Sequence, residues 1–131
     1  MKNLLMLALA FFATQFVSAQ APLNVINKSA PVSYDNVENR PMYPGGMNEF
    51  IKFVGKNFKA PDVEGLSGVM KVSFVIETNG SVSDIKIEND LGHGSAEEAK
   101  RVIMKLPKWT PGDQDGKPVR VLYTLPITIR N

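Results

Sequence analysis

Histidine and cysteine, the side chains that most often act as nucleophiles, bases or metal ligands, are nearly missing from this chain. There is no Cys, and the single His, His93, stands between Gly92 and Gly94. One imidazole cannot share a metal ion with a second His or Cys, and no second base accompanies a serine nucleophile. We therefore interpret His93 as an exposed loop residue. Thiol, disulfide and multi-histidine metal chemistry are excluded.

The remaining chemical patterns are weak. Residues 113–116 read DQDG, as a calcium loop can, but Leu122 stands where the bidentate Glu would be expected. Glu88 and Asp90 could form a carboxylate pair, yet their spacing gives no sign of convergence across a cleft. Trp109 is better explained as a core residue than as a ligand platform. The sequence thus predicts a non-enzymatic protein with no metal, no cofactor and no small-molecule substrate.

The length and charge of the chain indicate how many domains it has and exclude one class of partner. The chain has 131 residues, of which 44% are hydrophobic and 21% charged, which fits one globular domain. Fifteen Lys and Arg against thirteen Asp and Glu leave a net charge of +2. This is too little positive charge to indicate a nucleic-acid partner.

Residues 1–19 have the features of an export signal. Lys2 precedes an apolar run over residues 4–13, and residues 17–19 read VSA before a possible cleavage site. The run is shorter than the roughly 20 apolar residues of a membrane-spanning helix. We predict a cleaved signal peptide, with an uncleaved anchor over residues 4–19 as the alternative. Residues 20–40 are polar, show no sustained period and predict an extended arm.

Two amphipathic helices are expected in the rest of the chain. The first follows Gly45-Gly46, a pair that could also receive an anion at the helix start, and it ends before Pro61. Its stripe lies near spacings i, i+3, i+4 and i+7 and consists of Met47, Phe50, Ile51, Val54 and Phe58. The second begins with a capping box, Ser95 as N-cap and Glu98 at N3, and ends at Pro107.

Three strands are expected around them. Residues 68–78 alternate with their apolar face on even numbers, Asn79-Gly80 favours a type I′ hairpin turn, and residues 81–88 return. The alternation slips at Ser83-Asp84, which predicts a β-bulge. In the last strand, residues 119–129, Pro126 cannot donate to a ladder and indicates a sheet edge. The predicted fold class is α+β, with two helices packed on a three-stranded antiparallel sheet.

An exposed edge carries unpaired N–H and C=O groups that an extended chain can join. Two uses stay open: the edge binds a peptide, or it serves a scaffold or homodimer. Pro126 and the neighbouring arginines could also simply protect it from aggregation.

From about Arg40 onward the chain resembles the C-terminal domain of the TonB family. The likeness rests on the order and spacing of several short segments: Tyr43-Pro44, residues 68–76 (GVMKVSFVI), residues 79–82 (NGSV), Glu98-Ala99, residues 107–112 (PKWTPG) and residues 116–121 (GKPVRV). The resemblance implies the helix-on-sheet fold already reached, over residues 41–131.

It also implies a function in the periplasm of Gram-negative bacteria. Domains of this family bind a short N-terminal segment of TonB-dependent outer-membrane transporters, which pairs with the last strand, and couple transport to energy. The implied partner-binding residues are Tyr43, Pro44, Val119, Val121, Tyr123, Leu125, Ile127 and Ile129. Typical members have an uncleaved membrane helix and a long Pro-rich spacer. The predicted cleavable signal and the 21-residue arm over residues 20–40 depart from that pattern.

Overall fold

The computed structural model describes residues 29–131, so the predicted signal peptide and the first part of the predicted arm lie outside the described residues. The elements within that range are β1 (Val32–Ser33), α1 (Met47–Asn57), β2 (Ser67–Ile76), β3 (Val82–Glu88), α2 (Ser95–Met104), β4 (Asp113–Gln114), β5 (Lys117–Pro118) and β6 (Val121–Arg130). The two helices and three longer strands fall where the sequence periodicity predicted them. The α+β class is therefore confirmed.

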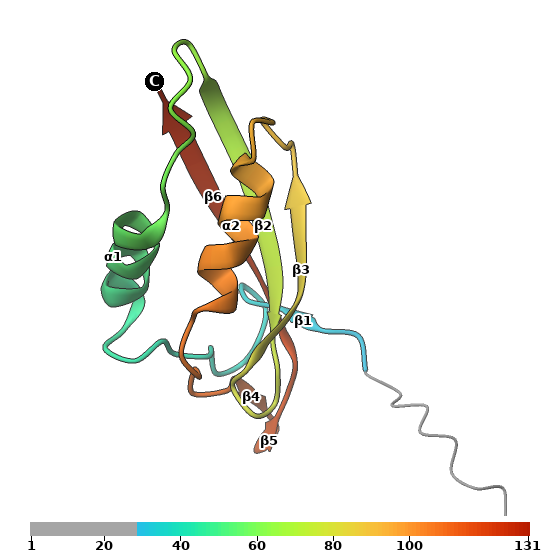
Figure 1. Cartoon of the computed structure of the whole chain (residues 1–131). Coiled ribbons are helices and arrows are strands. Elements are labelled where there is room, and N and C mark those ends of the chain that lie inside the picture. Colours follow the sequence, from blue (N-terminus) through green and yellow to red (C-terminus); the bar gives the residue numbers. More distant parts are fainter. Residues whose placement is uncertain (1–28) are drawn as a thin grey trace, which may run out of the picture.

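The main sheet has four strands in the order β1-β6-β2-β3, and it is mixed (Figure 1). β2 pairs antiparallel with both β3 and β6, as expected. The prediction of three antiparallel strands was wrong in one respect, because β1 adds a short parallel partner to β6. A strand of two residues has no period that a sequence could reveal.

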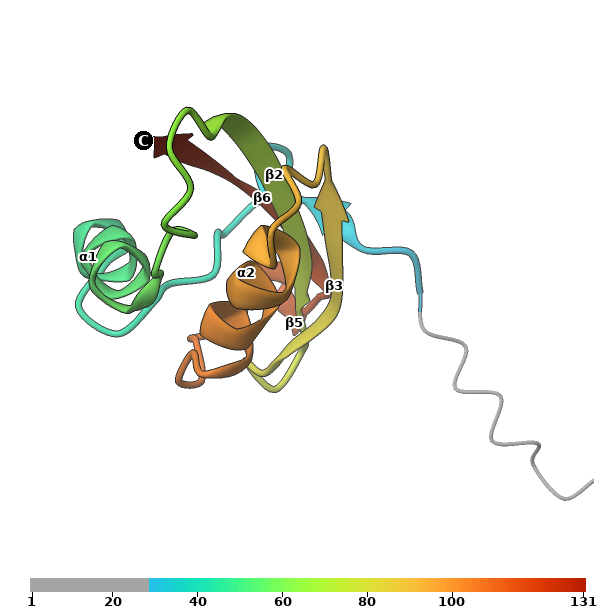
Figure 2. The ribbon, with the colours of Figure 1, turned by 45° about the horizontal axis from the view of Figure 1, so that its top comes forward.

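Both helices lie on one face of the sheet, α2 over β2 and β3 and α1 on the β6 side (Figures 1 and 2). The alternation of β2 determines which side chains they cover, because even-numbered residues point to one face. Those side chains, Met70, Val72, Phe74 and Ile76, are fully buried. Trp109 lies in the same core, with its ring centroid 4.9 Å from that of Phe50, as predicted.

The turn between β2 and β3 is not of the predicted type I′. Only Gly80 has a positive φ, at +85°, whereas a type I′ turn needs positive φ at both central residues. The amide of Gly80 bonds to the carbonyl of Glu77 at 2.8 Å, and the Asn79 side chain accepts the amide of Ser81 at 2.9 Å. The predicted bulge is present, since Asp84 has φ +48° where the β2–β3 register shifts.

The capping box at the start of α2 was also wrong. Gly94, in the left-handed conformation, is the N-cap, and Ser95 is the first helical residue. The Ser95 hydroxyl donates to a carboxylate oxygen of Asp90 at 3.2 Å, and so its side chain is not used to cap the helix. In residues 29–131, no helix has the length and apolar character needed to cross a membrane.

Candidate partner-binding edge

The outer edge of β6 is unpaired over most of its length. The carbonyls of Arg120 and Leu122 accept the amides of Val32 and Tyr34, both at 2.9 Å. Beyond Leu122, no strand of residues 29–131 pairs with β6 on this side. Backbone groups alternate in direction along a strand. The even-numbered residues from Thr124 to Arg130 therefore present their N–H and C=O groups outward.

Pro126 lies within this outward-facing set. Its missing N–H removes a donor from the outer edge and leaves the ladder with β2 intact, which runs without a register shift over the ten residues of β6. The expectation that Pro126 indicates an edge is thus met in part. β6 is an edge strand from Tyr123 onward, while its first two residues are covered by β1.

An apolar groove of about 300 Å³ runs beside the exposed edge, between α1 and β6. Its lining residues are Ile51, Val54 and Gly55 of α1, Phe58 directly after this helix, and Leu125, Pro126, Ile127 and Thr128 of β6. Ile51 is 48% exposed, although its position in the apolar stripe predicted a core residue. A chain that joined β6 would therefore be bordered by α1.

A second hollow of about 300 Å³ lies where β1 ends, between residues 33–35 and residues 122–124. Tyr34 packs edge-on against Tyr123, with ring centroids 5.0 Å apart. Burial is the main cause that raises the pKa of Tyr123, so its hydroxyl is neutral at physiological pH. β1 and Tyr34 therefore mark one end of the exposed edge.

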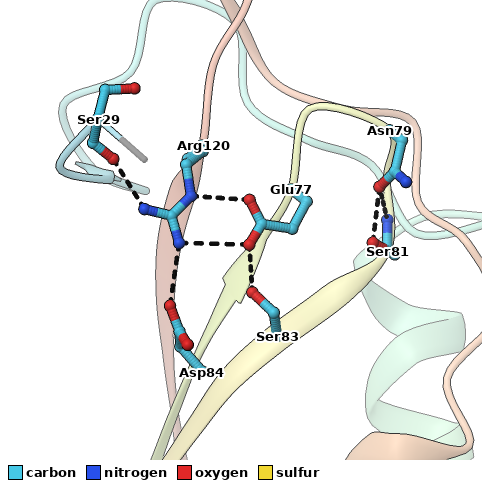
Figure 3. Close-up of polar contacts among 7 residues, drawn as sticks. All are labelled: Ser29, Glu77, Asn79, Ser81, Ser83, Asp84 and Arg120. Atoms are coloured by element: carbon cyan, nitrogen blue, oxygen red, sulfur yellow. Dashed lines mark hydrogen bonds and ion pairs between the residues drawn. The ribbon is translucent and has the colours of Figure 1, made fainter. Parts of the chain in front are cut away.

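A buried arginine holds β1 in place (Figure 3). The Arg120 side chain donates to the carbonyl of Ser29 at 2.7 Å, to the carboxylate of Glu77 at 2.7 and 3.2 Å and to Asp84 at 2.9 Å. Ser83 also donates to Glu77. Hydrogen bonds to the Glu77 carboxylate are the main cause that raises the pKa of Arg120. This network connects the described start of the chain to the end of β2 and the bulge of β3.

The structure places the odd-numbered residues implied by the family resemblance on the inner side of β6. Val121, Leu125, Ile127 and Ile129 are buried, and Tyr123 is half-buried. Val119 precedes β6, and its amide bonds to the carbonyl of Gly112 at 3.0 Å. The even-numbered residues between them direct their side chains to the face of the sheet without helices and their backbone groups to the open edge.

Tyr43 and Pro44 are not beside this edge. Tyr43 is 7% exposed and packs against Phe50 and Trp109, with ring centroids 5.6 and 5.5 Å away. Pro44 lines a separate hollow of about 520 Å³ with Lys52 and Lys56. Those lysines lie on the side of α1 opposite the groove, so the two hollows are separated by the helix.

The residues considered for chemistry have other roles. His93 is exposed in its loop, as expected. Asp90 accepts the amide of Gly92 at 2.8 Å, and Asp113 accepts the side-chain amide of Asn39. In the part of the chain that the structure describes, no group of three or more acidic or His side chains could hold a metal ion.

The contribution of α1 to this surface was not predicted from the sequence. Ile51 and Phe58 fit the apolar stripe of an amphipathic helix, whose expected place is against the core. A glycine inside an otherwise regular amphipathic helix was the one available signal.

Geometry alone defines a domain with an open strand edge next to an apolar groove, a combination suited to binding an extended peptide. The family model for the Gram-negative bacterial TonB protein C-terminal matches residues 62–129. No curated protein and no solved structure matches the chain.

The chain therefore belongs to the TonB C-terminal family. This is a family of non-enzymatic protein-interaction domains, and it indicates a TonB-like function in envelope transport.

Proposed function

We propose that this domain binds the N-terminal segments of TonB-dependent outer-membrane transporters by adding them as a strand to β6, in energy-coupled transport. The observation that carries the proposal is the row of outward-facing backbone groups from Thr124 to Arg130. Each unpaired N–H and C=O gains a partner when an extended chain joins the edge. The groove beside α1 then gives the added side chains an apolar surface to contact.

The partner-binding residues proposed here are those of β6, in two roles. Outward backbone groups at Thr124, Pro126, Thr128 and Arg130 pair with the segment. The inward residues Val121, Tyr123, Leu125, Ile127 and Ile129 fix the strand against β2 and the core. Tyr43 acts indirectly, through the core beneath α1, and Pro44 does so by holding the chain beside Tyr43. Val119 contributes through the approach of the chain to β6.

We place the interaction in the periplasm. The export signal over residues 1–19 stays a prediction, as does the alternative of an inner-membrane anchor, since these residues lie outside the described range. N-terminal sequencing of the native protein from cell fractions tests both. A chain that begins at Gln20 in the soluble fraction supports export, and an intact start in the inner membrane supports the anchor.

Titration of the ¹⁵N-labelled domain with synthetic transporter N-terminal peptides tests strand addition. The amides of Thr124 and Thr128 should shift most and exchange more slowly with solvent, because they gain hydrogen-bond acceptors. Amides of β3, on the far side of the sheet, serve as the internal control. No shift at Thr124 and Thr128 at millimolar peptide would overturn the proposal.

The same open edge also favours a second function, a scaffold that pairs two copies of the domain. Sedimentation of the domain alone separates the two functions. Concentration-dependent dimers without any peptide binding would support the scaffold. Peptide binding by a monomer would support the transporter partner.

A further inference from the structure

Gly55 lies inside α1 at a position where the fold of the domain does not require glycine. A helix-interior glycine lowers helix stability relative to alanine, so it usually reflects a backbone or packing need. Gly55 is not among the glycines with positive φ. A Cβ built at Gly55 would meet nothing within 4 Å. Within residues 29–131, neither the backbone nor a neighbouring side chain therefore requires glycine here.

The space over Gly55 opens into the groove beside β6. Ile51 stands four residues before Gly55 on the same helix face. Phe58, the C-cap residue of α1, follows Gly55 by three residues in an extended conformation and lines the same groove. The opposite wall is formed by residues 125–128 of β6. Gly55 thus marks a gap between two large apolar side chains, next to the exposed strand edge.

An added strand would direct side chains toward this gap. Paired strands lie about 4.8 Å apart, and every second side chain points to the same face of the sheet. On the helix-covered face, the next strand beyond Leu125 and Ile127 lies beneath α1. A side chain of that strand can enter between Ile51 and Phe58 only where the helix lacks a side chain of its own.

We infer that the gap at Gly55 receives one large apolar side chain, of the size of Leu or Phe, from the extended segment that joins β6. Gly55 thereby determines which peptides the domain accepts. The inference rests on the strand addition proposed above and adds the selecting element. Backbone pairing alone is nearly independent of sequence, whereas burial of an apolar side chain discriminates between peptides.

The decisive variant is Gly55→Leu, with Lys56→Leu as its matched control. Both place the same side chain on α1, but Lys56 lines the hollow on the other side of the helix. Neither should lower the melting temperature, because the Cβ of residue 55 meets open space and leucine is a good helix former. If the Gly55→Leu domain is folded but does not bind, the cause is then that leucine fills the gap.

The probes are N-terminal peptides of outer-membrane transporters, each also made with its apolar residues replaced singly by Ala. In the wild type, one such replacement should weaken binding about 10-fold or more, the effect of losing one buried apolar side chain. Gly55→Leu should weaken binding of the parent peptide by a similar factor and leave the affinity for that Ala-substituted peptide unchanged. Lys56→Leu should preserve the wild-type preference.

The outcomes also separate this inference from the proposed function. The amide signals of Thr124 and Thr128 could shift equally for the parent and Ala-substituted peptides and for the wild type and Gly55→Leu. That result would overturn the inference and leave strand addition in place. Absence of those shifts for every peptide would overturn both. A Gly55→Leu variant that abolishes self-association but keeps peptide affinity would assign the gap to a second copy of the domain and overturn the inference.

Discussion

The guanidinium of Arg120 contacts both carboxylate oxygens of Glu77, at 2.7 and 3.2 Å, and its remaining nitrogen reaches the carbonyl of Ser29 at 2.7 Å. Together with the backbone bonds from Val32 and Tyr34, this side chain therefore holds β1 against β6. Since β1 covers the first residues of β6, Arg120 also contributes to where the open edge begins.

Replacement of Arg120 by lysine should release β1 without unfolding the sheet. Lysine keeps the charge, but its single ammonium cannot reproduce the planar fork that contacts Glu77, Asp84 and Ser29 together. Hydrogen exchange of the Val32 and Tyr34 amides should become at least about 5-fold faster, as expected when a local contact of about 1 kcal/mol or more is lost. Exchange by NMR measures this directly.

The β2–β6 amides provide the control for that experiment. Their exchange should change little, because their ladder does not depend on β1. Equal acceleration in β1 and in the β2–β6 ladder would show that Arg120 stabilises the whole fold and would contradict a local role.

Substitutions at Pro126 and Thr124 test whether a peptide pairs with the open edge of β6, because they add or remove one backbone N–H donor. Pro126→Thr restores an outward N–H, so an added strand gains one hydrogen bond of about 1 kcal/mol, or roughly 5-fold in affinity. Thr124→Pro removes such a donor and should weaken binding by a similar factor. Isothermal titration with one transporter peptide compares both variants with the wild type.

Pro126→Thr should also increase self-association, because proline at an edge limits pairing between copies. Sedimentation at several concentrations measures this. Unchanged peptide affinity in both variants would mean that the peptide does not pair with β6.

Much of this fold was predictable from residue patterns. The burial of Met70, Val72, Phe74 and Ile76 follows from a strict alternation, and the bulge at Asp84 follows from its interruption. β1 was not predictable, because Val32–Ser33 is held by backbone pairing with β6 and by the Arg120 side chain rather than by a pattern of its own. The start of α2 differs from the predicted capping box for a related reason, since the Ser95 hydroxyl donates to Asp90.

The candidate site was predictable only in outline. Pro126 indicated an edge strand, and the family resemblance indicated its use. Which side chains face outward depends on the register with β2, and the groove depends on how α1 lies beside β6. Tyr43 belongs to the core because Phe50 and Trp109 surround it, a fact that no local spacing contains.

Two glycines with similar backbones should respond differently to alanine. Gly65 has φ +79° and open space around a Cβ, whereas a Cβ on Gly80, at φ +85°, would lie 1.9 Å from the carbonyl oxygen of Trp109. Gly65→Ala should cost about 1–2 kcal/mol of unfolding free energy from the left-handed backbone alone.

Gly80→Ala should cost about 3 kcal/mol or more, because the hairpin must also move away from Trp109 and lose the bond from the Trp109 amide to the Gly80 carbonyl, 2.9 Å long. Urea unfolding followed by the fluorescence of the single tryptophan measures both variants. Equal losses would contradict the close Gly80–Trp109 contact.

Acid should weaken the contact between the two helices. Arg101 donates to the Glu98 carboxylate at 2.8 and 3.1 Å and to the carbonyl of Asn57, the last residue of α1, at 2.8 Å. The hydrogen bonds from Arg101 are the main cause that lowers the pKa of Glu98 below its ordinary value of 4.5. A lowered pKa means that the stabilisation is complete above the unfolded-state value and is lost as the pH falls through the folded-state value.

Glu98→Gln should therefore lower the unfolding free energy at pH 7 by about 0.5 kcal/mol, the size of an ion pair at a helix surface. Below about pH 4.5 the difference from the wild type should shrink, because protonation removes the same charge from Glu98. Urea unfolding at pH 7, 5 and 3 measures the difference. Glu97→Gln, at the exposed neighbouring position, also removes a first-turn charge and is the control. It should lower the unfolding free energy at pH 7 by less than Glu98→Gln does, because the Arg101 bonds go to Glu98. A difference that stays constant from pH 7 to pH 3 would contradict the role of the Glu98 charge.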